Sequence, residues 1–318
     1  MNSAPAVNDE LAIVIPTRNR PDDLRNCLQS LVDQTMTPGL VVIADASDNG
    51  LSADVAGEYG SSIRKIEHIA CAVAGVTAQR NEGLLHIRPE TKYVGFADDD
   101  VVFDARYFSR IVALLDHAPD VVGASGVSTE PIHQIRRLDA MLLRLFLLGA
   151  ASESGQVLPS GVNVRPPRHG PATEVGWLFG CAVYRSALFD SNRFSEELLG
   201  YGAYEDVDFS LSAKRRGRLV VDPQATLQHR HSTENRIGLR ELHATSIAHR
   251  YRLVMSHRDQ GLRPAAYWWS VCGAAGFALA SLLHHPSEEA KAVFMGVCSG
   301  AVGAMGQAVL GLGNQGKS

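Results

Sequence analysis

The chain has 318 residues, with 34 acidic and 30 basic side chains and a formal net charge of −4, so general affinity for nucleic acid is not expected. This length suits one large α/β domain with an appendage. The five cysteines lie far apart without a Cys-x-x-Cys pair, which argues against a zinc ribbon or a disulfide scaffold and favours a reducing compartment.

The first hundred residues alternate strand and helix patterns. Four apolar runs have the length and composition of buried strands: 11–16, 40–44, about 63–69 and 93–97. Between the first two, Pro21 suits a first helical position, and Asp22 and Asp23 suit a first helical turn. A further helix carries Arg80. This rhythm predicts an α/β fold with a Rossmann-like, mainly parallel sheet flanked by helices.

Three of these strands end in polar side chains, at Thr17, Asp45 and Asp98. In open α/β sheets, ligands bind beyond the carboxyl ends of the strands. Asp98-Asp99-Asp100 is the most informative of the three, because adjacent buried carboxylates repel one another and a divalent metal is the usual relief. The alternative is an acidic turn before a helix capped by Asp104.

The middle of the chain is less regular, and its patterns predict a helix at 136–148, a loop at 159–171, a strand at 175–184, a helix from 205 to 216 and a strand at 219–221. The segment 136–148 is apolar with basic edges. It fits either a core helix or a helix that lies on an anionic membrane surface.

Two stretches near the end, 264–283 and 292–313, contain no charged residue and are long enough to cross a bilayer as helices. Gly296 and Gly300 would allow close helix packing. The alternatives are membrane contact and a pair of packed soluble helices. We expect a catalytic domain over 1–240 and a helical, membrane-associated region over 241–318.

The N-terminus has neither a basic start nor an apolar core and does not resemble a signal peptide. The catalytic part is therefore expected in the cytoplasm. Arginines before the first uncharged stretch would keep that end on the cytoplasmic side. The protein is therefore expected to be peripheral to, or anchored in, the cytoplasmic face of the cell membrane.

Ordered motifs from about residue 11 to residue 231 resemble those of the inverting family 2 glycosyltransferases, which have the GT-A fold. The motifs are Ile-Val-Ile-Pro-Thr-Arg-Asn-Arg at 13–20, Asp45 in Ile-Ala-Asp-Ala-Ser, Arg80-Asn81-Glu82-Gly83, Asp98-Asp99-Asp100, Trp177 to Gly180, Glu205-Asp206 and His229. Many members have Asp-Asp-Gly-Ser where this chain has Ala46 after Asp45, a departure that bears on the choice of base.

The resemblance implies a nucleotide site formed by Pro16, Thr17, Arg18, Asp45, Arg80, Asn81, Asp98 and Asp99. Within it, Asp45 would hydrogen-bond the base and Asp98 would approach the ribose. Asp100 and His229 would hold Mg²⁺ or Mn²⁺. Because His229 and His231 alternate along an extended segment, only one of them can face the site.

On the acceptor side, the resemblance places Trp177 and Gly180 at the acceptor and makes Asp206, beside Glu205, the general base. A base within hydrogen-bond reach of an acceptor hydroxyl can take its proton as the hydroxyl attacks the sugar. Asp208 is the alternative base and points about half a helical turn away. Both carboxylates could otherwise be charges that stabilise a helix N-terminus.

The sequence therefore predicts a metal-dependent inverting hexosyl- or deoxyhexosyltransferase. The donor would be a UDP- or dTDP-sugar, and the acceptor a hydroxyl of a glycan or lipid-linked sugar in polysaccharide or glycolipid synthesis. One alternative is a sugar nucleotidyltransferase, although residues 16–20 contain no glycine for a phosphate loop. The other is a non-catalytic sugar-nucleotide or glycan-binding subunit, against which Asp100 and Asp206 both argue.

Overall fold

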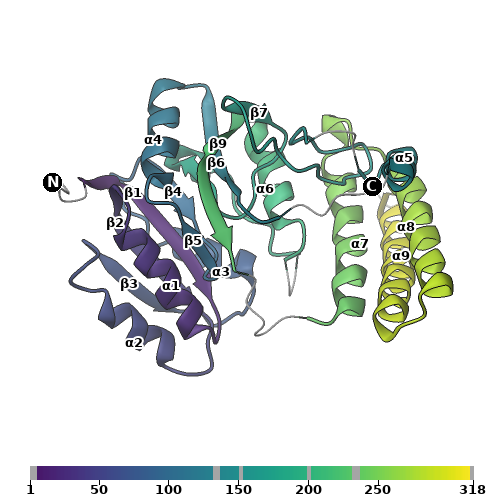
Figure 1. Cartoon of the computed structure of the whole chain (residues 1–318), viewed down its shortest axis with the longest axis horizontal. Helices are drawn as coiled ribbons and strands as arrows, with labels where there is room; N and C mark the ends of the chain where they lie inside the picture. Colours follow the sequence, from purple (N-terminus) through teal and green to yellow (C-terminus); the bar gives the residue numbers. More distant parts are fainter. Residues whose placement is uncertain (1–5, 132–136, 150–152, 199–201, 231–236, 316–318) are drawn as a thin grey trace. The chain divides into compact units, whose positions relative to one another are not determined.

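The computed structural model describes residues 6–131, 137–149, 153–198, 202–230 and 237–315. The chain divides into two compact units (Figure 1). The first comprises residues 1–132 and 166–236, and the second comprises residues 133–165 and 237–318. The boundary expected at residue 240 lies close to the second division, but the segment 133–165 joins the C-terminal helices.

The first unit is built on one mixed sheet, whose strand order is β3-β2-β1-β4-β8-β6-β9-β5, with β7 also paired to β9. Its strands are β1 Ala6–Thr17, β2 Met36–Asp45, β3 Ile66–Ala70, β4 Tyr93–Phe96, β5 Val101–Phe103, β6 Val121–Ser128, β7 Thr173–Val175, β8 Val183–Arg185 and β9 Arg218–His229. The run β3-β2-β1-β4 is parallel as expected. Beyond it, antiparallel pairs of β8 with β4 and β6 interrupt the parallel pattern.

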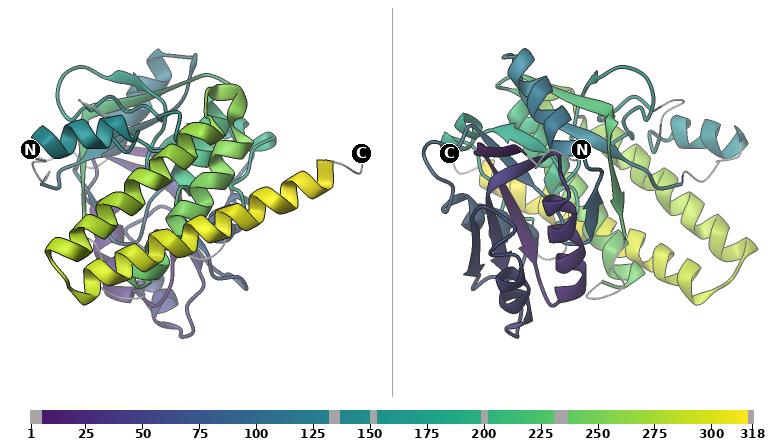
Figure 2. Two further views of the ribbon diagram at one scale, coloured as in Figure 1. Left: turned by 90° about the vertical axis from the view of Figure 1, so that its right-hand side faces the viewer. Right: turned by 60° about the vertical axis from the view of Figure 1, so that its left-hand side comes forward.

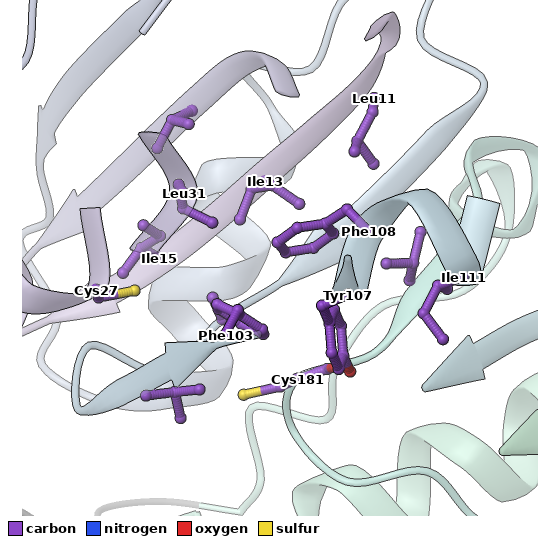
Figure 3. Close-up of a cluster of buried hydrophobic side chains, with 14 of the residues drawn as sticks. Leu11, Ile13, Ile15, Cys27, Leu31, Phe103, Tyr107, Phe108, Ile111 and Cys181 are labelled. Carbon is purple, nitrogen blue, oxygen red and sulfur yellow. The ribbon is translucent and has the colours of Figure 1, made fainter. Parts of the chain in front are cut away.

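Helices cover both faces of this sheet (Figure 1). They are α1 Pro21–Val32, α2 Leu51–Glu58, α3 Val76–Leu84, α4 Tyr107–His117, the 3₁₀ turn η1 Ser186–Asp190 and α6 Glu205–Lys214. Leu11, Ile13 and Ile15 alternate along β1 and point to one side, where they meet the buried faces of α1 and α4 (Figure 3). This core fixes the carboxyl ends of β1 and β4 beside each other.

Two sequence expectations need correction. The stretch 175–184 is not one strand, because β7 ends at Val175 and β8 begins at Val183. The residues between them form a connection whose Leu178 exchanges backbone hydrogen bonds with the Ser210 hydroxyl of α6. The strand expected at 219–221 is longer, since β9 continues to His229. The residues from 175 to 184 are mostly apolar and resemble one strand in sequence. In the structure, the contact of Leu178 with α6 holds the middle of this stretch out of the sheet.

The second unit is helical and comprises α5 Arg137–Leu145, α7 Leu239–Ser256, the 3₁₀ turn η2 Arg258–Gln260, α8 Pro264–His284 and α9 Glu288–Gln315. The last two form an antiparallel hairpin against α7 (Figure 2). A side chain at Gly296 would lie 2.5 Å from the Arg240 carbonyl oxygen, and one at Gly300 would lie 2.6 Å from that of Ala244. The absence of these side chains lets α9 approach α7 closely.

The helix expected at 136–148 is observed in part, as α5, which ends at Leu145; Arg136 lies outside the described residues. Just after α5, Phe146 stacks on Trp269 of α8 with ring centroids 5.1 Å apart. Leu138 and Met141 are each 66% exposed. The segment is thus anchored to α8 at one end and presents apolar side chains to the surface along the rest.

Candidate active site

The first of the three adjacent carboxylates, Asp98, lies beside a buried arginine. Arg80 of α3 donates from Nη2 to Asp98 Oδ1 at 2.9 Å and from Nη1 to Glu205 Oε1 at 3.0 Å. The Arg80 side chain is 1% exposed. Burial lowers the pKa of Arg80, but the carboxylates of Asp98 and Glu205 more than offset this effect, and the guanidinium stays charged. One cation thus joins the end of β4 to the start of α6.

The second carboxylate, Asp99, turns into the protein. It accepts hydrogen bonds from the Thr17 hydroxyl at 2.8 Å and from Arg20 Nη1 at 3.2 Å. Burial raises the pKa of Asp99 to about 7, against the opposing effects of Arg20 and Thr17. Asp99 therefore anchors the loop after β1 to the end of β4.

The third carboxylate, Asp100, meets the histidine at the end of β9. His229 Nε2 lies 2.9 Å from Asp100 Oδ1, and Arg20 Nη1 lies 4.0 Å from Asp100 Oδ2. Burial lowers the pKa of His229, but the Asp100 carboxylate raises it above its ordinary value. The two expected metal ligands are therefore adjacent, although 129 positions separate them in the sequence. His231, the alternative, lies outside the described residues.

These residues fit a divalent cation. Among the residues that the structure describes, no three His, Cys, Asp or Glu side chains form a complete metal cage. Mg²⁺, however, is commonly held by only one or two carboxylates together with substrate phosphates. Asp100 and His229 provide one carboxylate and one imidazole at the rim of the sheet, donors that also suit Mn²⁺.

The start of α6 brings two further carboxylates to the site. Tyr204, just before the helix, has a φ of 70°, and the backbone N–H of Asp208 bonds its carbonyl oxygen at 2.9 Å. Burial raises the pKa of Glu205, while Arg80 lowers it. Burial, and after it the Glu205 carboxylate, raises the pKa of Asp206 well above its ordinary value. A carboxylate with a raised pKa is suited to accept a proton near neutral pH.

On the opposite side of the rim, Asp45 ends β2 and is 5% exposed. Its Oδ1 accepts the Ser47 N–H at 2.8 Å, and its Oδ2 lies 2.9 Å from His68 Nε2 of β3. Arg18 is half-exposed and lies 3.7 Å from Asp48. The carboxylate of Asp45 is therefore oriented by two protein groups before any ligand binds.

Pro16 and Thr17 close β1. Pro16 is buried in the strand, in register with Ala44 of β2. Gln79 of α3 donates to the carbonyl oxygens of Thr17 at 2.8 Å and Ala44 at 2.7 Å, which binds the two strand ends together. The backbone here supports the rim, while the Arg18 side chain, the next in sequence, reaches solvent.

Asn81 lies on a different face of α3 from Arg80. Its side-chain amide donates to the Phe194 carbonyl at 2.9 Å and to Glu196 at 2.8 Å, and its carbonyl accepts the Phe194 N–H at 3.0 Å. It lines a cavity of about 640 Å³ on the outer side of α3. In the structure Asn81 thus holds the segment at 194–196, and its predicted contact with a nucleotide stays a prediction.

The two residues expected on the acceptor side, Trp177 and Gly180, have different surroundings. Trp177 is buried, with 8% of its surface exposed. Gly180 faces the carboxylates: a side chain there would lie 2.8 Å from Arg80 Nη2 and 3.2 Å from Asp98 Oδ2. Its carbonyl oxygen accepts from Arg80 at 3.4 Å. Glycine is needed at this position because the guanidinium occupies the space.

Sequence reasoning missed three residues that shape the site: Arg20, His68 and Gln79. Arg20 stands in the motif at 13–20 and could have been chosen as a partner for the acidic triplet. His68 falls in the expected third strand, but its pairing with Asp45 depends on the register of β3 beside β2. No local signal marks Gln79.

Comparison with known proteins identifies glycosyltransferases as relatives of this chain. The pattern of the family described as "Glycosyl transferase family 2" matches residues 12–187, more than half of the chain. The glycosyltransferase YibD of Escherichia coli K12, described as uncharacterized, is 32% identical over 115 residues, 36% of this chain and 33% of its own length. EpsJ of Bacillus subtilis, described likewise, is 24% identical over 212 residues, 66% of this chain and 57% of its own length. The chain thus spans only part of these relatives.

Solved structures show the same fold. A mannosyltransferase, PcManGT from Pyrobaculum calidifontis, in complex with GDP-Man and Mn²⁺, superposes with a TM-score of 0.52 and 15% identity, covering 99% of this chain and 82% of that one. TarS of S. aureus superposes with a TM-score of 0.51 and 16% identity, covering 87% of this chain and 74% of that one. At these identities the likeness shows a GT-A-like fold.

Proposed function

The chain belongs to glycosyl transferase family 2, and from this membership we propose that it moves a sugar from a nucleoside-diphosphate sugar to an acceptor hydroxyl, with inversion and with the help of a divalent metal. The observation that carries the proposal is the convergence at one sheet rim of Asp98, Arg80 and Glu205 on one side and Asp100 with His229 on the other. These contacts bring donor-side and acceptor-side motifs together.

On the donor side, Asp45 would accept a hydrogen bond from the base and Asp98 would approach the ribose. Asp100 and His229 would hold Mg²⁺ or Mn²⁺, which supplies Lewis-acid stabilisation of the departing diphosphate. Asp99 and Thr17 keep the loop that carries Arg18 in place. The protein's own contribution here is to orient the donor and to fix the charges around its phosphates.

On the acceptor side, Asp206 would take the proton of the attacking hydroxyl. Inversion needs one base and direct attack on the face opposite the leaving group. Retention by double displacement would need a nucleophile, by analogy with glycosidases. We assign the base to Asp206 rather than Asp208 because burial and Glu205 raise the pKa of Asp206. Trp177 and Gly180 lie on the segment bonded to α6, where an acceptor would enter.

We further propose a UDP- or dTDP-hexose or deoxyhexose as the donor, and a glycan or lipid-linked sugar as the acceptor. The fold neighbours support a nucleotide sugar in general: TarS is described in complex with UDP-GlcNAc and PcManGT with GDP-Man. The different bases in those two complexes mean that the fold alone does not select the base. Asp45 is the residue whose contacts would do so.

Binding of nucleotide sugars can be tested by thermal unfolding. We expect UDP- or dTDP-sugars with Mn²⁺ or Mg²⁺ to raise the unfolding midpoint, because a ligand bound only by the folded state stabilises it by roughly 2.7 kcal/mol at 100 times its Kd. A chelator should abolish the shift. A nucleoside triphosphate plus sugar phosphate that stabilised the chain better than any nucleoside-diphosphate sugar would favour a nucleotidyltransferase instead.

We propose that the helical unit contacts the cytoplasmic face of a membrane. Its helices Pro264–His284 and Glu288–Val309 are long and apolar enough to cross a bilayer, and only 28% and 22% of their most apolar 18-residue stretches are buried. Support comes from α8, where exposed residues recur at steps of three and four along one face: Ala265, Trp269, Cys272, Gly276, Leu279 and Leu283. Arg258 and Arg263 precede this stripe and suit anionic headgroups.

Co-sedimentation with vesicles tests this contact. The double variant Leu279→Glu/Leu283→Glu is expected to lose most vesicle binding, because Leu279 and Leu283 are 42% and 72% exposed and would carry charge into the apolar layer. Leu51→Glu changes a leucine of α2 that is 51% exposed and is the matched control. The same fraction of it should co-sediment with vesicles as of the unchanged chain. The membrane proposal is wrong if the unchanged chain of 318 residues remains in the supernatant when vesicles are sedimented.

A further inference from the structure

Arg80 is the most enclosed charged group in the candidate site. Besides its two carboxylate partners, its guanidinium carbon lies 5.6 Å from the ring centre of Phe96 and 5.2 Å from that of Phe194. Gly180 closes the remaining side, since even a methyl group there would lie 2.8 Å from Nη2. The guanidinium plane is therefore fixed by packing on its faces and by carboxylates at its edge.

The two partners of this cation belong to opposite halves of the proposed reaction. Asp98 follows β4 and begins the run of donor-side carboxylates, and Glu205 opens the helix that carries the proposed base. Arg80 and Glu205 stand 125 positions apart in the sequence, so their contact forms only when the chain folds.

We propose that Arg80 is a positioning residue that locks the start of α6 onto the end of β4, so that Glu205 faces the cation and Asp206 is left to face the acceptor. The inference rests on the proposed function. In the structure Glu205 Oε1 is engaged by Arg80 at 3.0 Å, whereas Asp206 Oδ1 accepts the backbone N–H of Val207 at 2.8 Å. The two neighbouring carboxylates therefore have different partners and different tasks.

The charges around Glu205 and Asp206 predict a measurable effect on the pH dependence of activity. Among the residues that the structure describes, the charged or titratable groups that act on Glu205 and Asp206 from other elements include Arg80 of α3, Asp98 after β4 and Tyr184 of β8. After burial, the Glu205 carboxylate is the largest cause that raises the pKa of Asp206, and Arg80 opposes it. Removing the cation and removing the Glu205 charge should therefore shift the pKa of the base in opposite directions.

The test is the pH profile of kcat/KM for sugar transfer, whose acidic limb reports the pKa of the base in the free enzyme. Arg80→Met should move this limb to higher pH, because the cation that favours ionised carboxylates is gone. Glu205→Gln should move it to lower pH, because the charge that opposes ionisation of Asp206 is gone. Both shifts should be measurable, because Glu205 is next to Asp206 in the chain and Arg80 binds Glu205 at 3.0 Å.

Two more variants separate positioning from stability. Arg80→Lys keeps the charge but loses the two-pronged contact, so it should retain the wild-type pH profile while lowering kcat. Arg185→Lys is the matched control: Arg185 also stacks over an aromatic ring, that of Tyr93 at 5.9 Å, but binds backbone carbonyls instead of carboxylates. It should lower the unfolding midpoint without moving the pH profile.

The outcomes are distinct. If the Arg80 and Glu205 variants lose activity while their pH profiles stay as unshifted as that of Arg185→Lys, Arg80 is structural and the inference is wrong. Shifts of both variants in the same direction would also overturn it. Should Arg80→Met fail to fold, the Glu205→Gln and Arg80→Lys profiles still decide. Unchanged protein that transfers no sugar from any nucleotide sugar would instead refute the proposed function itself.

Discussion

Replacing Asp206 with asparagine is expected to lower kcat for sugar transfer by ~10²–10⁴-fold while leaving the affinity for nucleoside diphosphate nearly unchanged. The amide has the size of the carboxylate but cannot accept the acceptor's proton. The donor side keeps Asp98, Asp100 and His229, so nucleotide binding should survive. Single-turnover transfer and calorimetric titration with UDP or dTDP, in the presence of Mn²⁺, measure the two quantities separately.

Asp208→Asn is the matched control, because Asp208 lies in the same first turn of α6. It should retain most of the activity. A dead Asp208 variant beside an active Asp206 variant would transfer the role of base to Asp208. The pH dependence has a definite sign: burial and Glu205 raise the pKa of Asp206, so the base is ionised above that pKa and activity falls as the pH drops through it.

Asp100→Asn is expected to abolish metal-dependent turnover, with a loss of at least ~10²-fold, because several kcal/mol of charge stabilisation disappear with the metal and each 1.36 kcal/mol is tenfold in rate. Unlike the Asp206 variant, it should weaken nucleoside-diphosphate binding as well. The loss of Mn²⁺-dependent thermal stabilisation by the nucleotide gives a readout that does not depend on turnover.

Asp104→Asn controls for the loss of one acidic group near the same strand end. Asp104 is exposed, and its carboxylate accepts the Arg106 N–H at 3.1 Å before α4. This variant should bind metal and nucleotide as the unchanged chain does. Full activity of Asp100→Asn in the presence of a chelator would show that the reaction needs no metal at this position.

Much of the fold could be predicted because its signals are local. The run β1-α1-β2 follows from apolar periodicity, from Pro21 at the helix start and from polar residues at the strand ends. Between Val101 and Ser128 the sequence analysis names only a possible helix after Asp104, which corresponds to α4 at Tyr107–His117. The strand β5 is hard to predict because it has only three residues. The connection between β7 and β8 is predicted wrongly as a strand, because its conformation depends on hydrogen bonds to Ser210 of α6 and not on its own sequence.

The candidate site shows the same division. The acidic triplet and the Glu205-Asp206 pair are visible as sequence motifs, and the structure brings both to one rim. Their partners are not visible, because the contact of Arg80 with Glu205 and that of His68 with Asp45 join separate segments. The partners of Asn81 are equally invisible in the sequence: it follows Arg80, and one step along the helix turns it toward the segment at 194–196.

The two edges of the sheet bear on how the protein avoids self-association. One edge is β3, five residues long, where Glu67 and His68 place polar groups on both faces. The other side of β9 is shared by β5 and β7, which have three residues each. Short, polar or interrupted edges offer a poor template for an incoming strand. Strand-to-strand aggregation is therefore disfavoured in the folded state, and apolar surfaces elsewhere are where unwanted association would begin.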